Sequence, residues 1–249
     1  MLINKSPTKQ MKINTTSKPI SVPCFQDKSS YLLNHLQSLT FGEIKQIMRT
    51  NDTITQETTR RFQEIKFDLE GSCAIQTYCG LQFQYMQIEE AIQFAYLQRH
   101  LRILSGFYGL LKPYDSIYPY RLEMQARIAL DGGKDLYTYW NTQIAQALDD
   151  ELSSHEVPVL LNVASKEYEK ACISYMNSKV ITLTFKIRKQ DKLKTESTQV
   201  KMARGRMIHY LSMNQVNTLD QVRSFHEDGY QFMEELSTEQ EYVFVKEIL

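Results

Sequence analysis

The sequence predicts one compact domain of mixed α/β (α+β) class, and three patterns support this prediction. An apolar run at 157–163 leads directly into a segment with helical character at 165–172. A second run, at 180–187, is apolar and rich in β-branched residues, as buried strands are. Amphipathic segments with apolar residues every three or four positions alternate with such runs. Interleaved helices and strands indicate a mixed α/β domain.

In the first half of the chain, periodicity and capping signals set the expected elements. Thr40 and Glu43 have the spacing of a capping box, so a helix is expected to begin after Thr40. A polar turn at 49–53 separates this helix from the next. The expected elements are a strand at 1–3, helices at 29–39, 41–48 and 56–66, a strand at 72–78, a helix ending at His100, and a short apolar segment at 101–105.

In the second half, the run at 180–187 is the clearest strand, and a hairpin turn is expected at 190–192. Thr218 is expected to cap a late helix. The remaining expected elements are a helix at 135–149, a strand at 157–163, helices at 165–172 and 200–213, and a strand at 242–245.

Composition limits the class of protein. The chain has 249 residues, of which 42% are hydrophobic and 23% charged, with 29 Lys+Arg against 29 Asp+Glu. Such a chain can bury a large core, and without repeats or a low-complexity linker we predict one domain over 1–249. No apolar run approaches the roughly 18–20 residues of a membrane span, and no secretory signal is evident, so we expect a cytoplasmic protein without membrane contact.

Cysteine and histidine give no sign of a metal site. The four cysteines contain no C-x-x-C pair, and the five histidines have no ligand spacing. We therefore expect neither metal nor cofactor. Cys73 and Cys79, six residues apart, are either peroxide-sensitive thiols or buried structural ones.

The segment 119–124, PYRLEM, is the first candidate site. Arg121 and Glu123 are two residues apart, so in an extended chain they project from the same side. They could bind a phosphate and activate a water, or pair with each other as a buried ion pair. Just before them, Gly106 and Gly109 could free backbone N–H groups for a phosphate or simply form a structural turn.

The segment 161–168, LNVASKEY, is the second candidate site. Asn162 and Ser165 follow an apolar strand, where many α/β proteins place a binding site. The alternative is that Ser165 caps a helix and Asn162 is a hydrogen-bonded loop amide.

A basic tract at 179–206 is the third candidate. It holds nine Lys or Arg against two acidic residues, which predicts either a positive surface or a solvated hairpin. On a helix at about 100° per residue, Lys201 and Arg204 share one flank, whereas Arg206 lies on the other side of an apolar stripe. Lys201 and Arg204 are therefore the expected functional pair.

These clusters together resemble the YaaA family of peroxide-stress proteins. The matching stretches, in the family's order, are LSGFYGLLKPYD at 104–115, PYRLEM at 119–124, GKDLY at 133–137 with Trp140, LNVASKEY at 161–168, ARG at 203–205 and DGY at 228–230. SPTK at 6–9 resembles the family's Ser-Pro-Ala-Lys with Thr in place of Ala.

The resemblance implies a cytosolic protein of the oxidative-stress response that limits free iron and binds DNA. It also implies a compact α/β body with a positively charged cleft and a helix-hairpin-helix element. In this chain that element would be the helix 41–48, the turn 49–54 and the helix 56–66. The turn has no glycine, and its Asp52 would repel a phosphate.

The leading hypothesis is a non-enzymatic protein that binds double-stranded or branched DNA without strong sequence specificity. The residues expected to contact DNA are Arg49, Arg60, Arg61, Lys186, Arg188, Lys189, Lys201 and Arg204. The alternative is an enzyme acting on a nucleotide, nucleoside or nucleobase. Its candidate residues are Lys9, Tyr120, Arg121, Glu123 and Asn162, with Lys201 nearby. Direct iron chelation is the least favoured function because clustered ligands are absent from the sequence.

Overall fold

The computed structural model describes residues 1–190 and 192–248 of the chain. Their main strands form a mixed sheet of eight strands in the order β4-β3-β1-β6-β7-β10-β9, with β8 paired to β7. These strands are β1 (Leu2–Lys5), β3 (Leu101–Ser105), β4 (Gly109–Leu111), β6 (Val159–Asn162), β7 (Lys179–Lys189), β8 (Lys192–Lys194), β9 (Tyr230–Phe232) and β10 (Glu241–Glu247). A separate pair joins β2 (Ser72–Cys73) to β5 (Ser116–Ile117).

Five strands of the large sheet run parallel, and this direction decides where a site can form. β1 lies between β3 and β6, and both pairings are parallel, as are those of β7 with β6 and β10. All four residues of β1 and of β6 are buried, as expected for parallel strands that are covered on both faces. The carboxyl ends of these strands therefore meet at one edge of the sheet.

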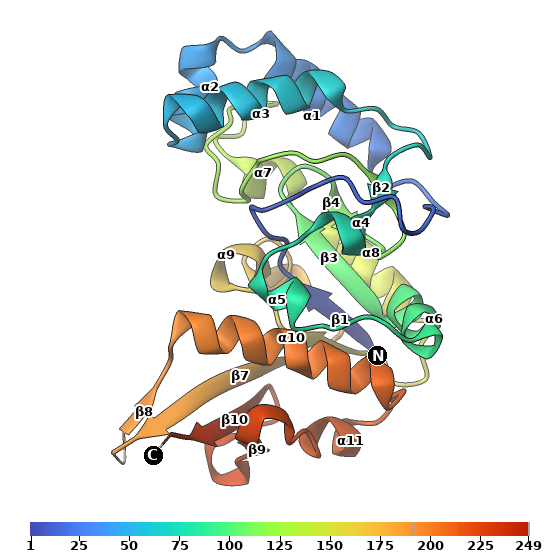
Figure 1. Cartoon of the computed structure of the whole chain (residues 1–249), viewed down its shortest axis with the longest axis vertical. Helices are drawn as coiled ribbons and strands as arrows, with labels where there is room; N and C mark the ends of the chain where they lie inside the picture. Colours follow the sequence, from blue (N-terminus) through green and yellow to red (C-terminus); the bar gives the residue numbers. More distant parts are fainter. Residues whose placement is uncertain (191, 249) are drawn as a thin grey trace.

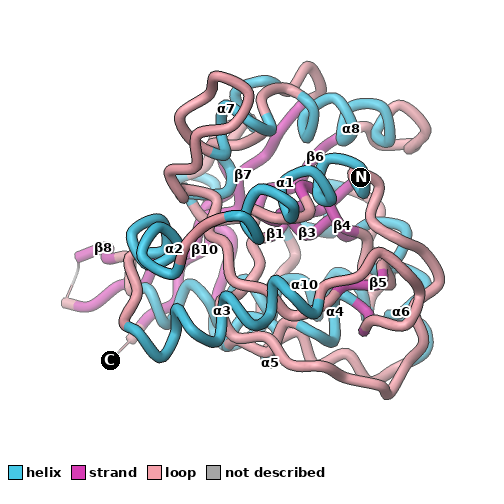
Figure 2. The backbone as a smooth tube through the Cα atoms, turned by 90° about the horizontal axis from the view of Figure 1, so that it is seen from above, coloured by secondary structure: helices cyan, strands magenta, loops and turns pink. Residues whose placement is uncertain are grey.

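The helices surround this sheet (Figure 1). They are α1 (Gln26–Ser38), α2 (Phe41–Met48), α3 (Asp52–Glu64), α4 (Ala74–Thr77), α5 (Leu81–Gln84), α6 (Ala91–His100), α7 (Leu136–Trp140), α8 (Gln143–Leu152), α9 (Lys166–Glu169), α10 (Ser197–Met213) and α11 (Leu219–Arg223), with short 3₁₀ turns at Ile173–Tyr175, Glu227–Gly229 and Glu234–Leu236. The helices α1–α3 form a layer at one end of the molecule, and α10 crosses β7 at the other (Figure 1). Seen from above, β8 projects from the side opposite α6 (Figure 2). None of the helices in the described residues has the length and apolar character needed to cross a membrane.

The capping box predicted at Thr40 is confirmed. The Thr40 hydroxyl accepts from the Glu43 N–H at 3.3 Å, and the Glu43 carboxylate accepts from the Thr40 N–H at 2.8 Å. The next helix begins earlier than predicted, because the Asn51 side chain caps it by accepting from the Ile54 N–H at 3.0 Å. The turn is therefore shorter than 49–54, and Arg49 supplies its left-handed residue with φ 51°.

Two predicted elements are wrong in type or extent. The segment 72–78 is not one strand, because its chain turns into α4 after Cys73, where the Thr77 hydroxyl donates to the Cys73 carbonyl at 2.9 Å. Ala74, Ile75 and Tyr78 are buried together, which is helical spacing. The helix predicted at 135–149 is broken into α7 and α8 at Asn141, whose φ of 45° is left-handed.

The strand predicted at 180–187 and the hairpin that follows it are present, since β7 pairs antiparallel with β8. The predicted turn 190–192 includes residue 191, which lies outside the described residues. The helix predicted at 165–172 is shorter and is confined to α9.

Candidate functional site

A cavity of about 490 Å³ lies at the carboxyl ends of β1 and β6. This is the edge at which parallel α/β sheets place their ligands. Its lining comes from the segments after these two strands, from α5, from the loop before Met124, and from α10. The lining residues that carry polar chemistry are Ser6, Thr8, Lys9, Gln10, Gln82, Tyr120, Arg121, Glu123, Ser165, Glu167, Tyr168, Lys201 and Arg204.

Two serines join the chain segments that leave β1 and β6. The Ser6 hydroxyl donates to the Ser165 hydroxyl at 3.2 Å and accepts from the Ser165 N–H at 2.8 Å. On the other side, the Gln82 amide donates to the Ser6 and Pro7 carbonyls at 3.2 and 3.1 Å. Ser165 thus occupies the N-cap position of α9, but its hydroxyl serves the β1 loop rather than capping the helix. The result is a rigid wall around the cavity.

Lys9, Arg121 and Glu123 meet in the lining of the cavity. Glu123 Oε1 lies 2.9 Å from Lys9 Nζ and 3.3 Å from Arg121 Nη2. Neither contact has hydrogen-bond geometry, and the buried Oε1 atom has no hydrogen-bond partner in the described residues. Of the two sequence interpretations, the Arg121–Glu123 ion pair is therefore present, but its carboxylate oxygen can still accept a hydrogen bond from a ligand.

Tyr120 fixes the segment that carries Arg121 and Glu123. Its hydroxyl lies 2.8 Å from the Tyr78 hydroxyl and 2.7 Å from the Ser105 hydroxyl. Burial raises the pKa of Tyr120 to about 12, so this group is a neutral hydrogen-bonding anchor at physiological pH.

The glycine turn before this segment is structural. The Ser105 hydroxyl accepts from the Phe107 and Tyr108 N–H groups, and Trp140 donates to the Gly106 carbonyl at 3.0 Å. Gly106 and Gly109 are enclosed by protein atoms, so of the two sequence interpretations the structural turn holds and the phosphate loop does not.

On α10, Lys201 and Arg204 both line the cavity, whereas Arg206 points elsewhere. Arg206 Nε lies 3.4 Å from Asp228 Oδ2, and the Arg206 guanidinium lies over the Tyr85 ring. Between them Gly205 lets α10 approach α5 closely, because a Cβ there would lie 2.5 Å from the Gln82 carbonyl oxygen. In Figure 1, α5 and α10 accordingly lie side by side next to β1.

Sequence reasoning missed Lys5, the last residue of β1. Its side chain is fully buried, with Nζ 3.3 Å from the centre of the Phe83 ring. Burial, with the charge of Arg204 as a second cause, holds the pKa of Lys5 well below its usual value. The signal was a lysine at the end of an apolar strand, in the run Leu2-Ile3-Asn4-Lys5, where burial demands an explanation.

Asn162 is close in sequence to the cavity but does not line it. Its amide donates to Glu169 Oε2 at 2.9 Å and its carbonyl accepts from the Ala164 N–H at 3.0 Å. It is fully buried at the end of β6. The structure thus favours the hydrogen-bonded amide over the catalytic role.

The expected DNA-contacting residues fall into separate groups. Arg49 lines a second cavity of about 1,040 Å³, which shares Lys9, Arg121 and Glu123 with the first. The others, apart from Lys186, Lys201 and Arg204, are paired with carboxylates: Arg60 with Glu64, Arg61 with Glu57, Arg188 with Glu247 and Lys189 with Glu196. The basic tract is thus divided between the cavity wall and the β7–β8 hairpin.

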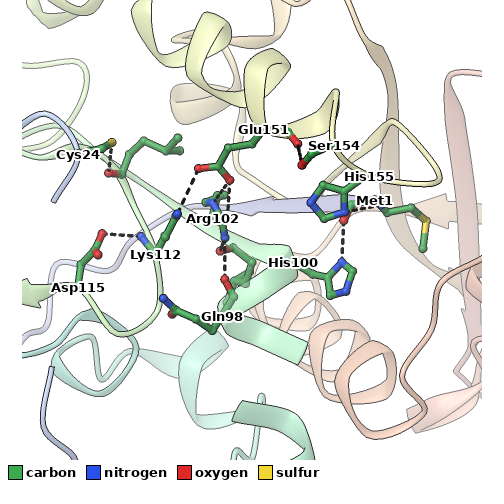
Figure 3. A network of polar contacts seen from close by, with 12 residues as sticks. Met1, Cys24, Gln98, His100, Arg102, Lys112, Asp115, Glu151, Ser154 and His155 are labelled. Atoms are coloured by element: carbon green, nitrogen blue, oxygen red, sulfur yellow. Dashed lines mark hydrogen bonds and ion pairs between the residues drawn. The ribbon is translucent and has the colours of Figure 1, made fainter. Parts of the chain in front are cut away.

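At the opposite end of the strands the polar groups satisfy one another (Figure 3). Arg102 donates from Nε to Glu151 Oε2 at 2.6 Å and from Nη1 to the Gln98 carbonyl at 3.1 Å. His100 Nδ1 lies 2.8 Å from the Met1 carbonyl oxygen, and burial lowers the pKa of His100. The two ends of the sheet therefore differ in kind, because unpartnered polar atoms gather at the carboxyl end.

Two buried thiols are poorly suited to react with peroxide. Burial raises the pKa of Cys73, and it raises the pKa of Cys172 to about 12. Because the thiolate is the reactive form, we expect both to resist millimolar hydrogen peroxide in the folded protein. Mass spectrometry after peroxide and thiol alkylation checks this, and sulfenic acid on either residue in native protein would contradict it.

No group of three or more His, Cys, Asp or Glu residues is placed to hold a metal ion within 1–190 and 192–248. The chemistry available in the cavity is that of cations, a carboxylate pair and hydroxyls.

Comparison with known proteins assigns the family. The model of the family described as "Peroxide stress protein YaaA" matches residues 1–236. UPF0246 proteins of Agathobacter rectalis and Clostridioides difficile are 38% and 37% identical to the chain, over 100% and 99% of it and 100% of each relative. A UPF0246 protein of Ligilactobacillus salivarius is 39% identical over 99% of the chain and 100% of its own length. The chain therefore belongs to the YaaA (UPF0246) family of peroxide-stress proteins.

Proposed function

We propose that this protein is a cytoplasmic DNA-binding protein that limits iron-dependent damage during peroxide stress. The observation that supports the proposal is a mostly cationic lining in two adjoining cavities, which share Lys9, Arg121 and Glu123. We call these two cavities together the groove. Its charged lining comprises Lys9, Arg49, Arg121, Arg127, Lys170, Lys201 and Arg204, against Glu43, Glu123, Asp135 and Glu167.

Such a groove suits a phosphate backbone better than base edges. Lysine and arginine side chains bind phosphates regardless of sequence and release the condensed counterions. Ferrous ions are among the cations that condense on DNA. When protein cations take their place, fewer ferrous ions remain bound at the DNA backbone. This links DNA binding to protection without direct iron chelation.

Helix α2 and Arg49 after it supply one wall of the groove in this proposal. Arg49, exposed at the end of α2, lines the wider cavity together with Gln46. The charge of Asp52, which would repel a phosphate, is partly offset because Lys45 Nζ lies 2.6 Å from its Oδ1. In this proposal α2, the turn after it and α3 form the helix-hairpin-helix element, and Arg49 is its DNA-contacting cation.

Fluorescence anisotropy with labelled duplex and branched DNA at several salt concentrations tests the proposal. Replacing Arg49 and Arg127 with glutamine should weaken binding and reduce the salt slope by about two, one per lost phosphate contact. Lys112→Gln, at the opposite end of the strands, is the matched control and should leave the slope unchanged. Equal slopes for the double variant and the parent would refute the groove as the DNA site.

A second function is favoured by one specific observation, the buried Glu123 carboxylate between Lys9 and Arg121. A carboxylate in a cavity beside two cations can move a proton to or from a nucleotide, nucleoside or nucleobase. Glu123→Gln should then abolish turnover while leaving DNA affinity within about twofold. Loss of DNA binding in this variant, or turnover without the carboxylate, would argue against that enzyme.

A further inference from the structure

Unsatisfied polar atoms concentrate around the first cavity. Among the described residues, nine buried side-chain nitrogen or oxygen atoms have no hydrogen-bond partner. Four of them belong to Lys5, Arg121, Glu123 and Arg204, and of these only Lys5 does not line the cavity itself. Because buried polar groups almost always find partners, such a concentration marks a place where a ligand completes the structure.

Lys5 and Arg204 carry two of these unpartnered atoms. Lys5 Nζ and Arg204 Nε are both buried nitrogen donors without an acceptor, and the charge of each group opposes the other. Ser6, the next residue after Lys5, lines the cavity beside Arg204. Burial and the charge of Arg204 favour neutral Lys5 in the absence of a ligand, and an anion between the two groups would allow Lys5 to take up a proton and bind the anion.

A further basic residue lines the same cavity as Arg204. Lys201, one helical turn before Arg204 on α10, is exposed and lines the same wall. Arg121 and Lys9, by contrast, share the single carboxylate of Glu123. None of the ion pairs among the described residues includes Lys5, Lys201 or Arg204, although the charge of Glu169 also acts on Arg204.

We propose that Lys5, Lys201 and Arg204 form a binding site for a phosphate monoester, with the rest of the ligand extending toward Glu123. A phosphate monoester carries up to two negative charges and three acceptor oxygens, enough to serve all three cationic groups. The cavity, at about 490 Å³, lies within the size range of sites for small organic ligands. The Glu123 carboxylate, whose Oε1 has no hydrogen-bond partner in the described residues, can then accept a hydrogen bond from a polar group of the ligand.

Two kinds of molecule can supply this phosphate monoester. The proposal rests on the proposed DNA-binding function but requires only the first cavity, not the whole groove. One is a free nucleoside 5′-monophosphate, and the other is the 5′-phosphorylated end of a DNA strand. Both present the same phosphate monoester joined to a nucleoside. An internal phosphodiester, with a single negative charge and two bridging oxygens, fits the three-cation site less well.

The test measures thermal stabilisation and calorimetric binding of the full chain with defined compounds. Thymidine 5′-monophosphate and inorganic phosphate should raise the melting temperature, whereas thymidine should not. A thymidine oligonucleotide with a 5′-phosphate should bind at least tenfold more tightly than the same oligonucleotide without it if strand ends are the source. Binding of the mononucleotide alone assigns the free nucleotide, and absence of any phosphate-dependent binding overturns the proposal.

Lys5→Met separates function from structure. The unbranched methionine fills a similar volume without a charge, so the variant should melt about 3–6 °C higher than the parent. It should also bind thymidine 5′-monophosphate at least tenfold more weakly. A folded variant that is less stable than the parent, or one that is more stable and still binds normally, contradicts the inference. Should Lys5→Met fail to fold, Arg204→Leu carries the same binding test.

The DNA-groove variants keep the two proposals apart. Replacing Arg49 and Arg127 with glutamine should leave mononucleotide binding intact, because neither residue lines the first cavity. Lys12→Met, an exposed lysine outside both cavities, is the control for a general charge effect. Loss of duplex binding with retained mononucleotide binding, or the reverse, then identifies which of the two proposals fails.

Discussion

Replacing Gly205 with valine should lower the free energy of unfolding by about 3 kcal/mol or more. A Cβ at this position would lie 2.5 Å from the Gln82 carbonyl oxygen and 2.6 Å from the Tyr85 Cβ. The first obstacle is backbone of α5, which cannot rotate away as a flexible side chain could. Relief requires α10 to move from α5, and Arg204 and Lys201 would move with it.

Gly42→Ala is the matched control for this prediction. Gly42 also lies within a helix, α2, but a Cβ there would meet no atom within 4 Å. Alanine should therefore stabilise the protein by about 0.5–1 kcal/mol through its higher helix propensity. Urea unfolding followed by circular dichroism measures both changes. A Gly205→Val variant within 1 kcal/mol of the parent would show that the α5–α10 contact is soft.

Local signals in the sequence predict local structure well. The pair Thr40 and Glu43 specifies a helix start because both partners of the capping box are three residues apart. The run at 180–187 specifies β7 because its buried residues alternate, with Ile181, Leu183 and Phe185 in the core. Such elements need only neighbours in the chain, so a single sequence contains the information.

The turn into α4 depends on distant parts of the chain. At α4, the Ala74 and Ile75 N–H groups donate to the carbonyls of Asp115 and Pro113, about 40 residues later. No periodicity within 72–78 reports those acceptors, and its apolar residues suit a strand equally well. The error in this segment is therefore an override of local pattern by tertiary hydrogen bonds.

The candidate site was predictable in its parts but not in its assembly. Arg121 and Glu123 were singled out because they share one side of an extended segment, and Lys201 and Arg204 because they share one helix flank. What joins them is the segment after β1, where Lys9 contacts Glu123 and the Ser6 carbonyl accepts from Gln82 of α5, the helix on which α10 packs. These partners are far apart in the chain, so no local pattern reports the contacts between them.

Lys5 shows more clearly why part of the site could not be predicted from the sequence. Its burial follows from its place at the end of a central strand, and Phe83 and Arg204, which surround it, come from α5 and α10. The sequence marks it only as a charge after an apolar run, which is also how a solvated strand end looks. A local conflict of this kind, a lysine where a core residue fits, is typical of functional positions.

Lys5 should also make stability rise with pH across the alkaline side of neutrality. Its pKa is lowered in the folded protein by burial and by Arg204, whereas in the unfolded chain it returns to about 10.4. Between the two values the unfolded chain binds a proton that the folded protein does not. Raising the pH therefore disfavours unfolding throughout this window, and the gain ends only above about pH 11, when Lys5 is neutral in both states.

The difference between the parent and Lys5→Met isolates this effect from the other titrating groups, including the tyrosines whose pKa values burial raises. At pH 7 the methionine variant should be more stable by about 1–3 kcal/mol, the cost of an unpartnered buried polar group. That advantage should shrink as the pH approaches 10, because the free energy of unfolding of the parent rises with pH whereas the methionine has no proton to lose. Urea unfolding at pH 7, 8, 9 and 9.5 measures it, with Lys12→Met as the exposed control. An advantage that is constant with pH would mean that Lys5 has the same protonation in both states, and that an acceptor already holds its charge.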